Sequence, residues 1–418
     1  MALNTLSSNF SSDVSLYIAK KTLMIALKEM ALYQLCDKAQ MPHNNGRTFQ
    51  YTRYERVVLP QSTLSEGVTP GDTSMSISIV TAVMDQWGAV IPLSDVAIDS
   101  VNHPVLQKAI ELAAYQAKET VDREICLVML AGTNVFYPNA ITARGSLTTS
   151  DKLDSGSIGK VVANLRYKGA RPMDGSFLVG VVDPYSEEDL IASSAFLNAA
   201  QYSNIKVLMN QEIGEWKGVR WVRSNTLPSI GLATGASAAT AGTAGGSLAN
   251  ATAYYFKLAV VNPNTGHEEF MTAQFTATTG ASDEAIDVTV PALPSGAVAG
   301  STFRLYMGST SGTLYLKASG IAASSTYNVL TNPTSGNLAQ AAAPSGVRVH
   351  FAFIMGKEAI SCVELNKIQS YLTPSAPSDS DPLVQRRKVG WKCDFKAVIC
   401  NQDYLARLEH YTTNGANP

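Results

Sequence analysis

A chain of 418 residues with 45% hydrophobic residues is long enough for two or three domains with real cores. The formal net charge of −2 disfavours a protein that binds nucleic acid through a strongly basic surface, because such proteins carry an excess of Lys and Arg. Charged residues make up 16% of the chain, against roughly 25% in ordinary soluble proteins. Burial of surface against other subunits would explain this deficit, and an Ala/Gly/Thr-rich segment also contributes to it.

The five cysteines are odd in number and have no CxxC spacing, which favours reduced, partly buried thiols over a zinc site or a disulfide framework. The N-terminus has neither a basic patch nor an apolar run, so we expect no signal peptide and a protein made and used in a cytoplasm.

The first hundred residues predict an arm and a hairpin. Ser12 or Asp13 can cap an amphipathic helix that continues to about Asp37. Two strand-like stretches, 46–59 and 74–93, then flank a polar loop with a Thr-Pro-Gly-Asp turn. Because an isolated hairpin is marginally stable in water, we expect it to lie on another surface, and a neighbouring subunit is one candidate.

Residues 103–132 predict a long helix. Pro104 suits its first turn and Gly132 suits the position just past its end. The many charged residues within it exclude a membrane span. The predicted apolar face consists of Leu106, Ile110, Ala113, Ala114, Ala117, Val121, Ile125 and Val128.

The stretch 155–225 predicts mixed α/β structure. We expect a helix over Ile158–Tyr167, a strand within 177–184, a second helix starting at Ser186, and a strand near Val219–Val222.

The composition changes at Thr226. Residues 226–250 are rich in Ala, Gly, Thr and Ser and predict a flexible linker, and 331–346 predict a second one. Because a strand-like run resumes at Val347, the β-sandwich of roughly one hundred residues between these linkers reads as an insertion. Its predicted strands are 254–261, 270–277, 285–290, 302–307, 314–318 and 326–329.

The C-terminal region predicts one half-buried strand, in which Val389, Trp391, Cys393 and Phe395 face a core. Residues 402–410 are expected to form a turn or a short helix.

No pattern predicts catalysis, a metal site or a cofactor. Gly156–Lys160 lacks the first glycine and the preceding strand of a phosphate-binding loop, so it predicts a helix start. His267 lacks the second histidine of a zinc protease, and the acidic cluster at 283–287 lacks the pattern of a calcium loop. The basic run at 386–388 favours a solvated or salt-bridged turn over a nucleic-acid contact.

Three separated blocks, in order, resemble the major capsid proteins of the phage N-four coat-protein family, which have the Hong Kong 97-type fold. The blocks are LSEGVTPGDTSMSISIVTAVMDQWGAVIPLSDVAIDS (64–100), PVLQKAIELAAYQAKETVDREICLVMLAGTNVFYP (104–138) and DPLVQRRKVGWKCDFKAVICNQDYLARLE (381–409). The segment TFRLYMGSTSGTLYLKASG (302–320) resembles immunoglobulin-like or fibronectin type III-like domains.

The resemblance implies an α+β capsid fold divided into named parts. These are an N-terminal arm (1–45), an extended loop (46–95), a peripheral domain (96–180) with the spine helix 103–132, an axial domain (181–225 and 347–375), the inserted sandwich (226–346) and a return to the peripheral domain (376–418).

The resemblance also implies a function and partners. The chain would assemble through hexamers and pentamers into an icosahedral shell around a tailed phage's double-stranded DNA, with the sandwich on the outer surface and without catalysis. Expected partners are further copies, a portal, possible scaffolding or decoration proteins and non-specifically contacted DNA, but no membrane. The expected location is the virion, after assembly in the host bacterial cytoplasm.

Members of this fold can join a Lys of the extended loop to an Asn of a neighbour. This chain has no Lys between Lys38 and Lys108, so we expect no such cross-link. The candidates for non-covalent contacts between subunits are Arg47, Arg53, Arg56, Glu66, Arg386, Arg387 and Lys388.

Two other functions remain open from the sequence. One is a carbohydrate-binding or adhesive surface protein whose sandwich is the binding module, and the other is an enzyme of unrecognised type.

Overall fold

The computed structural model describes most of the chain. The described ranges are 31–44, 46–55, 57–60, 63–64, 66–67, 69, 71–95, 105–173, 175–193, 214–241, 246–282, 284–336, 347–372 and 385–413. Most of the predicted arm, Pro104 and the second linker from 337 onward lie outside these ranges. The chain divides into two compact units, and each is described by itself. The first contains Asp85–Thr120 and Leu365–Phe395, and the second contains Glu29–Met84, Val121–Glu364 and Lys396–Pro418.

In the first unit, β4 (Asp85–Ser94) pairs antiparallel with β20 (Arg386–Ile399), from Arg386 opposite Ser94 to Phe395 opposite Asp85. The four residues predicted to face a core, Val389, Trp391, Cys393 and Phe395, are all buried. The alternation itself is incomplete, because Gly390 and Asp394 between them are buried as well. The indole N–H of Trp391 donates to Oε1 of Gln116 at 3.0 Å, which ties this strand to helix α3 (Val105–Leu130).

The predicted long helix is present, but its apolar face was partly wrong. Ala113, Ala117, Val121 and Ile125 are buried as expected, whereas Ile110 and Ala114 are exposed. The buried face follows steps of four residues, Ala109, Ala113, Ala117, Val121, Ile125 and Met129. Its first half is alanine, and small residues allow a helix to approach its neighbours closely. The buried face is therefore selected by size as well as by hydrophobicity.

The second unit contains a six-stranded sheet of order β5-β21-β18-β6-β8-β7. Its strands are β5 (Val135–Phe136), β6 (Leu178–Val182), β7 (Glu215–Trp216), β8 (Val219–Arg223), β18 (Val349–Met355) and β21 (Leu405–Tyr411). Every residue of β6 and β18 is buried. The sheet and helix α4 (Ser155–Tyr167) share a core that includes Ile158, Leu165 and Ile354.

Helix α4 begins at the glycine-containing run, as predicted. Asp154 caps it: the carboxylate accepts from the backbone N–H of Gly156 at 3.2 Å and of Ser157 at 2.9 Å. The aspartate that departs from the phosphate-loop pattern is thus a helix cap. Helix α5 (Pro184–Ile191) starts two residues before the predicted Ser186, because Pro184 suits the first helical position.

Strand β21 contradicts the prediction of a turn or short helix over 402–410. Only η3 (Gln402–Tyr404) is helical, and the strand that follows pairs with β18 on one side and β5 on the other. Its polar residues Arg407, Glu409 and His410 are buried and obscure the pattern of a core strand in the sequence.

The predicted arm helix ends earlier than expected. Helix α1 covers Leu32–Leu35, and Asp37–Gln40 form β1, which pairs in parallel with the start of β19 (Ile360–Leu372).

The predicted hairpin is present as a two-stranded ribbon of β2 (Thr48–Tyr54) and β3 (Ile77–Val83). The second predicted strand, 74–93, is however two strands, β3 and β4, separated at Met84. Met84 is buried, and its backbone N–H donates to the carbonyl of Arg47 at 2.8 Å. This contact closes the base of the ribbon, so β4 pairs with β20 instead.

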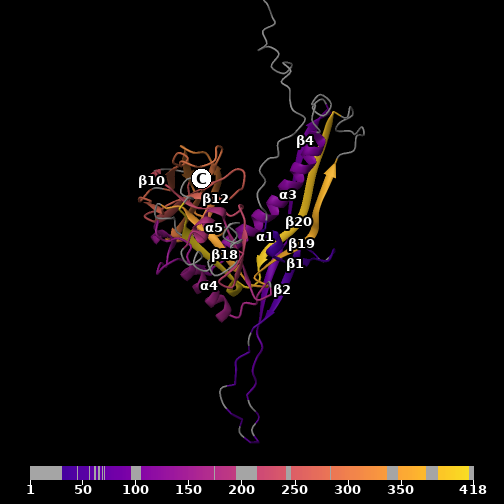
Figure 1. Cartoon of the computed structure of the whole chain (residues 1–418). Helices are drawn as coiled ribbons and strands as arrows, with labels where there is room; N and C mark the ends of the chain where they lie inside the picture. The colour runs from indigo at the N-terminus through magenta and orange to yellow at the C-terminus, as the bar shows by residue number, and fades with distance from the viewer. Residues whose placement is uncertain are drawn as a thin grey trace, which may run out of the picture. The chain divides into compact units, whose positions relative to one another are not determined.

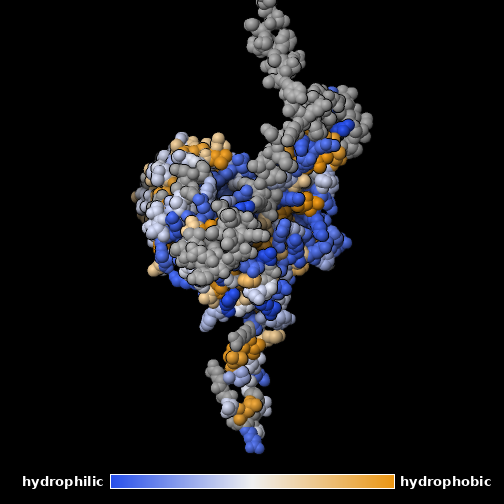
Figure 2. All heavy atoms as spheres, viewed as in Figure 1, coloured by the Kyte–Doolittle hydropathy of each residue, from blue (hydrophilic) through white to orange (hydrophobic). Residues whose placement is uncertain are grey.

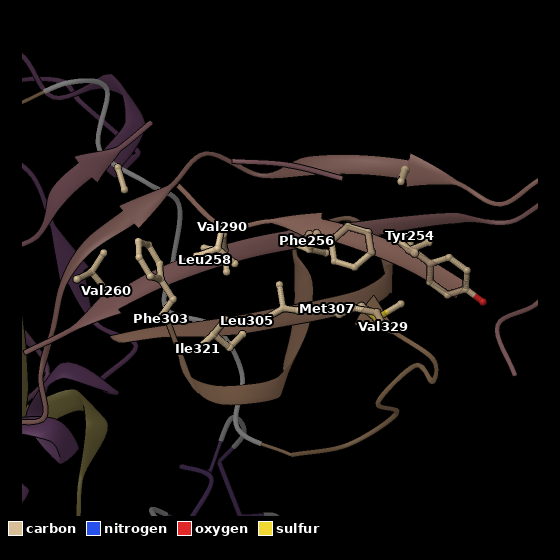
Figure 3. Close-up of a cluster of buried hydrophobic side chains, with 14 of the residues drawn as sticks. Tyr254, Phe256, Leu258, Val260, Val290, Phe303, Leu305, Met307, Ile321 and Val329 are labelled. Atoms are coloured by element: carbon tan, nitrogen blue, oxygen red, sulfur yellow. The ribbon is translucent and has the colours of Figure 1, made fainter. Parts of the chain in front are cut away.

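Residues 231–329 form two sheets over a shared core. The larger has the order β16-β15-β11-β12-β9 with β13 beside β11, and the smaller has the order β10-β14-β17. Phe256, Leu258, Phe303, Leu305 and Met307 fill the core between them (Figure 3). The strands are β9 (Gly231–Ala233), β10 (Ser237–Ala241), β11 (Ala253–Val261), β12 (Glu268–Thr272), β13 (Phe275–Thr278), β14 (Ala285–Thr289), β15 (Thr302–Thr310), β16 (Thr313–Ile321) and β17 (Thr326–Val329).

Two predictions for this insert were wrong. The expected linker 226–250 contains β9 and β10, because small side chains such as Ala233 pack against the core. The expected strand 270–277 is divided into β12 and β13.

The insert is held firmly where it leaves the six-stranded sheet. Ile230 and Val349 exchange two backbone hydrogen bonds, at 2.9 and 2.8 Å, so the two chain ends of the insert lie side by side. The guanidinium of Arg348 donates to Oγ of Ser229 at 2.7 Å and lies 4.9 Å from the ring centre of Phe270. The N-terminal connection is therefore a fixed junction.

Candidate assembly surfaces

The β2–β3 ribbon has one uncovered face. In the antiparallel register Tyr54 lies opposite Ile77, and Thr52 opposite Ile79. We call this side the ribbon face; it comprises Thr48, Gln50, Thr52, Tyr54, Ile77, Ile79, Thr81 and Val83. Its apolar members are half or more exposed, at 63% for Tyr54, 50% for Ile77, 59% for Ile79 and 50% for Val83.

The apolar exposure continues beyond the paired strands, at Val58, Leu64 and Met75. Figure 2 shows hydrophobic side chains, in orange, along the narrow segment that is the indigo hairpin of Figure 1. A soluble monomer rarely exposes a contiguous apolar surface of this kind, so the ribbon face has the character of a contact surface.

The opposite side of the ribbon contacts other strands of the same unit. Tyr51 shares a hydrogen bond of 2.5 Å with Ser361, whose hydroxyl donates to the carbonyl of Asp37 at 3.0 Å. Burial raises the pKa of Tyr51, so its hydroxyl stays protonated. These contacts fix the base of the ribbon and leave the ribbon face free to meet another molecule.

The candidate residues on the ribbon are only partly available for contacts. Arg47 donates to the carbonyl of Met84 at 2.7 Å and closes the ribbon base. Arg53 pairs with Glu55 at 2.7 Å, and Ser78 donates to the same carboxylate at 2.6 Å. The hydrogen bonds from Ser78 and Arg53 lower the pKa of Glu55. Glu66 is exposed, and Arg56 lies outside the described residues.

The three basic candidates near the C-terminus lie on β20 of the first unit. Arg387 is opposite Leu93 and is half-buried, whereas Lys388 is opposite Pro92 and is exposed. The backbone of Arg386 is opposite Ser94. They occupy a strand, which corrects the predicted turn.

The first unit exposes further apolar side chains of its own. Ile110 and Leu112 on α3 are 38% and 44% exposed, and Val90 on β4 is 61% exposed. Tyr371 and Leu372, at the end of β19, are about equally exposed, at 53% and 49%. These residues were not among the candidates. The sequence did contain a usable signal, because a buried helix face made of alanine leaves the larger Ile110 and Leu112 on the exposed side.

Asp122 is a buried carboxylate that the sequence did not identify. It accepts from the backbone N–H of Tyr33 at 3.1 Å and from the hydroxyl of Thr226 at 2.8 Å. Burial raises the pKa of Asp122, and these hydrogen bonds oppose the shift. The carboxylate joins α3 to the start of the described chain and to the segment just before the insert.

A second buried polar cluster joins α5 to the central strands. The hydroxyl of Ser186 donates to Asp183 and lies 2.6 Å from Nε2 of His410, and Nδ1 of His350 lies 2.8 Å from Asp183. Burial alone would raise the pKa of Asp183, but the hydrogen bond and charge of His350 hold it below its ordinary value. Burial lowers the pKa of His410 to about 4.

This cluster contains serine, histidine and aspartate, and Ser186 lies within hydrogen-bond distance of His410. Nδ1 of His410, however, lies 3.4 Å from the carbonyl of Leu408 instead of facing an aspartate. In a catalytic triad the aspartate orients the histidine that activates the serine. Here Ser186 donates to Asp183 itself, and Ser186 and His410 are fully buried. The arrangement holds α5 on the sheet.

A third buried network contains two arginines and one carboxylate. Arg144 forms two hydrogen bonds with Glu409, at 2.7 and 2.6 Å, and Arg407 lies 3.0 Å from the same carboxylate. Arg407 also donates to the carbonyl of Leu130. These contacts explain how a core strand accommodates charged residues.

The described ranges contain no group of three or more His, Cys, Asp or Glu side chains placed to hold a metal ion. All five thiols are free, and only Cys400 is not fully buried. None of the described helices is both long and apolar enough to cross a membrane.

Several solved phage capsid structures share the fold of this chain. The capsid chain of cyanophage Pam1 has a TM-score of 0.57 at 10% identity, over 99% of this chain and 100% of that chain. The capsid of Helicobacter pylori bacteriophage KHP30 has a TM-score of 0.56 at 9% identity, over 98% of both chains. The capsid of cyanophage P-SCSP1u has a TM-score of 0.55 at 10% identity, over 95% of this chain and 92% of that chain.

No protein-family model matches the sequence, and no curated protein matches it at a significant level. At 9–10% identity the likeness to the solved structures concerns the fold alone. It extends over nearly the whole length of both partners, including the region of the insert. The chain therefore has the mixed α+β fold found in phage capsid proteins.

Proposed function

We propose that this chain is a major capsid protein. It assembles through hexamers and pentamers into the icosahedral shell that encloses a tailed phage's double-stranded DNA, and it performs no catalysis. The full-length likeness to capsid folds supports this function. The observation that carries it is the ribbon face, an apolar surface on a two-stranded ribbon that needs support from another molecule.

Within this proposal the parts take the roles of a Hong Kong 97-type subunit of the phage N-four coat-protein family. The ribbon is the extended loop, α3 is the spine helix of the peripheral domain, and β8 and β18 belong to the axial domain. Strand β21, which the sequence assigned to the peripheral domain, pairs with β18, so we propose that it belongs to the axial domain as well. Portal and possible scaffolding or decoration proteins complete the particle. Assembly takes place in the host bacterial cytoplasm.

The insert is proposed to be an immunoglobulin-like or fibronectin type III-like sandwich on the outer surface of the shell. Its two sheets and separate core support a self-contained domain. A carbohydrate-binding role has less support, because none of the described Phe, Tyr and Trp side chains in 231–336 is exposed. Aromatic faces are the surfaces on which sugars usually stack.

The shell is proposed to be held together without isopeptide cross-links. The stretch between Lys38 and Lys108, which includes the ribbon and the segment connecting its strands, contains arginine but no lysine. Purified particles should therefore migrate as single subunits on a denaturing gel. A ladder of covalent multimers would contradict this proposal.

Negative-stain microscopy of the expressed full-length chain tests the function directly. Closed shells or capsomers are expected for the wild type. Ile79→Asp should abolish them while the subunit stays folded, because the charge lies on the ribbon face. Thr289→Asp, at an exposed strand position of the insert, is the matched control and should still assemble. A wild-type chain that stays monomeric at high concentration would overturn the proposal.

A further inference from the structure

Three segments far apart in the sequence meet at one end of the six-stranded sheet. They are the C-terminus of α4, the turn between β7 and β8, and the turn between β18 and β19. A Cβ atom on Gly218 would lie 2.5 Å from a guanidinium nitrogen of Arg166, and one on Gly356 would lie 2.7 Å from the carbonyl oxygen of Arg171. The backbone N–H of Lys357 donates to that carbonyl at 2.9 Å.

This end of the sheet carries five cationic side chains, which we call the basic end: Arg166, Lys168, Arg171, Lys217 and Lys357. Two of them have carboxylate partners, since Lys168 lies 2.8 Å from Asp403 and Arg171 lies 4.0 Å from Glu358. Arg166, Lys217 and Lys357 are exposed, and their side chains have no partner among the residues that the structure describes. Asp403 and Glu358 offset two of these five charges, and the exposed carboxylate of Glu215 lies in the same hairpin as Lys217, so this end keeps a smaller positive excess.

The backbone at Lys217 supports a role for its charge. Lys217 and Gly218 form a two-residue turn with φ of 56° and 76°. Turns of this type favour Asn, Asp or Gly at the first position, and other residues there cost about 1 kcal/mol or more. A lysine at this position is therefore not explained by the turn itself.

Tyr167 adds an uncovered aromatic side chain to the same end. It is the last residue of α4 and is 92% exposed, more than any other large hydrophobic side chain of the described chain. Its ring contributes nothing to the core at this exposure, and its hydroxyl is free to donate to an anion.

A purely structural explanation covers part of this cluster. Arg166 and Lys168 lie at the C-terminus of α4, where cations interact favourably with the helix dipole. That explanation does not extend to Lys217 and Lys357, which belong to turns between strands. The cations are also spread over three segments instead of converging on one point, which suits a linear polyanion better than a small ion.

We propose that the basic end binds the phosphate backbone of double-stranded DNA without sequence specificity. This inference rests on the proposed function, because a capsid shell encloses DNA. About three phosphates are contacted, by Arg166, Lys217 and Lys357, and Tyr167 adds a hydroxyl contact. A contact of this size is weak in one subunit and multiplied in a shell.

The test measures binding of a fluorescent 30-base-pair DNA duplex to the unassembled full-length chain at several salt concentrations. Three phosphate contacts predict a fall in the affinity of the wild type of roughly 40-fold between 50 and 200 mM salt. The triple variant Arg166→Gln, Lys217→Gln, Lys357→Gln should lose most of this dependence. The control variant Lys118→Gln, Lys367→Gln, Lys392→Gln removes the same charge from exposed positions of the first unit and should keep it.

The outcomes separate this proposal from the proposed function. Equal salt dependence in the wild type and the triple variant, or an equal loss in the control, would overturn DNA binding at the basic end. Loss of shells in the triple variant with unchanged DNA binding would identify a contact between copies of the chain and would also overturn it. Salt-dependent binding by a chain that never forms shells would support DNA binding at the basic end and contradict the proposed function as a shell subunit.

Discussion

The insert and the β2–β3 ribbon are both built from antiparallel strands, but they differ in where their apolar side chains lie. Phe256 and Phe303 of the insert are fully buried between two sheets, whereas Ile79 on the ribbon is 59% exposed. Three or more strands with a covered face can be stable alone, and a two-stranded ribbon is marginal. The insert thus covers its apolar side chains within one chain, and the ribbon leaves one apolar face exposed.

Truncating one side chain in each region tests this contrast and should give the largest effect. Phe303→Ala leaves a cavity in the insert core and should lower the free energy of unfolding by about 3–5 kcal/mol. Ile79→Ala should change that free energy by less than about 0.5 kcal/mol in the isolated subunit, because the side chain is already exposed. Urea denaturation of unassembled protein measures both.

In an assembly assay, Ile79→Ala should have the larger effect of the two substitutions, the reverse of their order in the free energy of unfolding. Ile79→Ala is expected to weaken shell formation, since the side chain lies on the ribbon face. Equal destabilisation of the isolated subunit by both substitutions would show that the ribbon face is covered within its own chain.

The next effect concerns acid, which should act on the sheet that the insert interrupts. Burial lowers the pKa of His410 from 6.5 to about 4 in the folded protein. The unfolded chain therefore binds this proton at higher pH, and stability falls as the pH drops from 6.5 to 4. The loss from His410 should reach about 3 kcal/mol at most. Asp183, with its lowered pKa, adds a further loss below its unfolded pKa of about 3.8.

Thermal unfolding between pH 7 and 4 measures this dependence. His410→Gln keeps a polar group beside Ser186 and should flatten the slope. His43→Gln, at an exposed position, is the matched control and should leave the slope unchanged. A slope that persists in His410→Gln would assign the acid sensitivity to other groups.

The smallest effect concerns the junction of the insert. Arg348→Ala removes the hydrogen bond to Ser229 and the contact with the ring of Phe270, and it should cost about 1–2 kcal/mol. Arg348→Lys retains a charge and should recover part of the loss. Limited proteolysis near residue 230 should become faster in the alanine variant. An unchanged rate would indicate that the Ile230–Val349 pairing holds the junction without the side chain.

The periodic parts of the fold were predictable from the sequence. The core-facing residues from Val389 to Phe395, the long helix and most strands of the insert follow from side-chain spacing alone. Strand β21 was not predictable, because Glu409 is buried through a partner, Arg144, that lies 265 residues away. The break at Met84 was also hidden, since the pairing of β4 with β20 is a long-range contact.

The candidate site residues were predicted with less success. Sequence reasoning selected charges on the ribbon, but Arg53 and Arg47 have partners within their own chain. The distinctive feature of the ribbon is the apolar face formed by Tyr54, Ile77 and Ile79, and the register between two strands determines it. The basic end likewise depends on three segments, one helix end and two turns, that the sequence separates by about fifty residues or more.

The Ile230–Val349 pairing has a practical consequence for engineering. Two chain ends that share a strand pair lie about 5 Å apart, which is the spacing that a foreign domain with adjacent termini would require. Residues 231–348 can therefore be regarded as a replaceable cassette, provided that the substitute also covers the neighbouring side chains Arg123 and Arg144. A shell of such subunits would display one copy of the foreign domain at every lattice position.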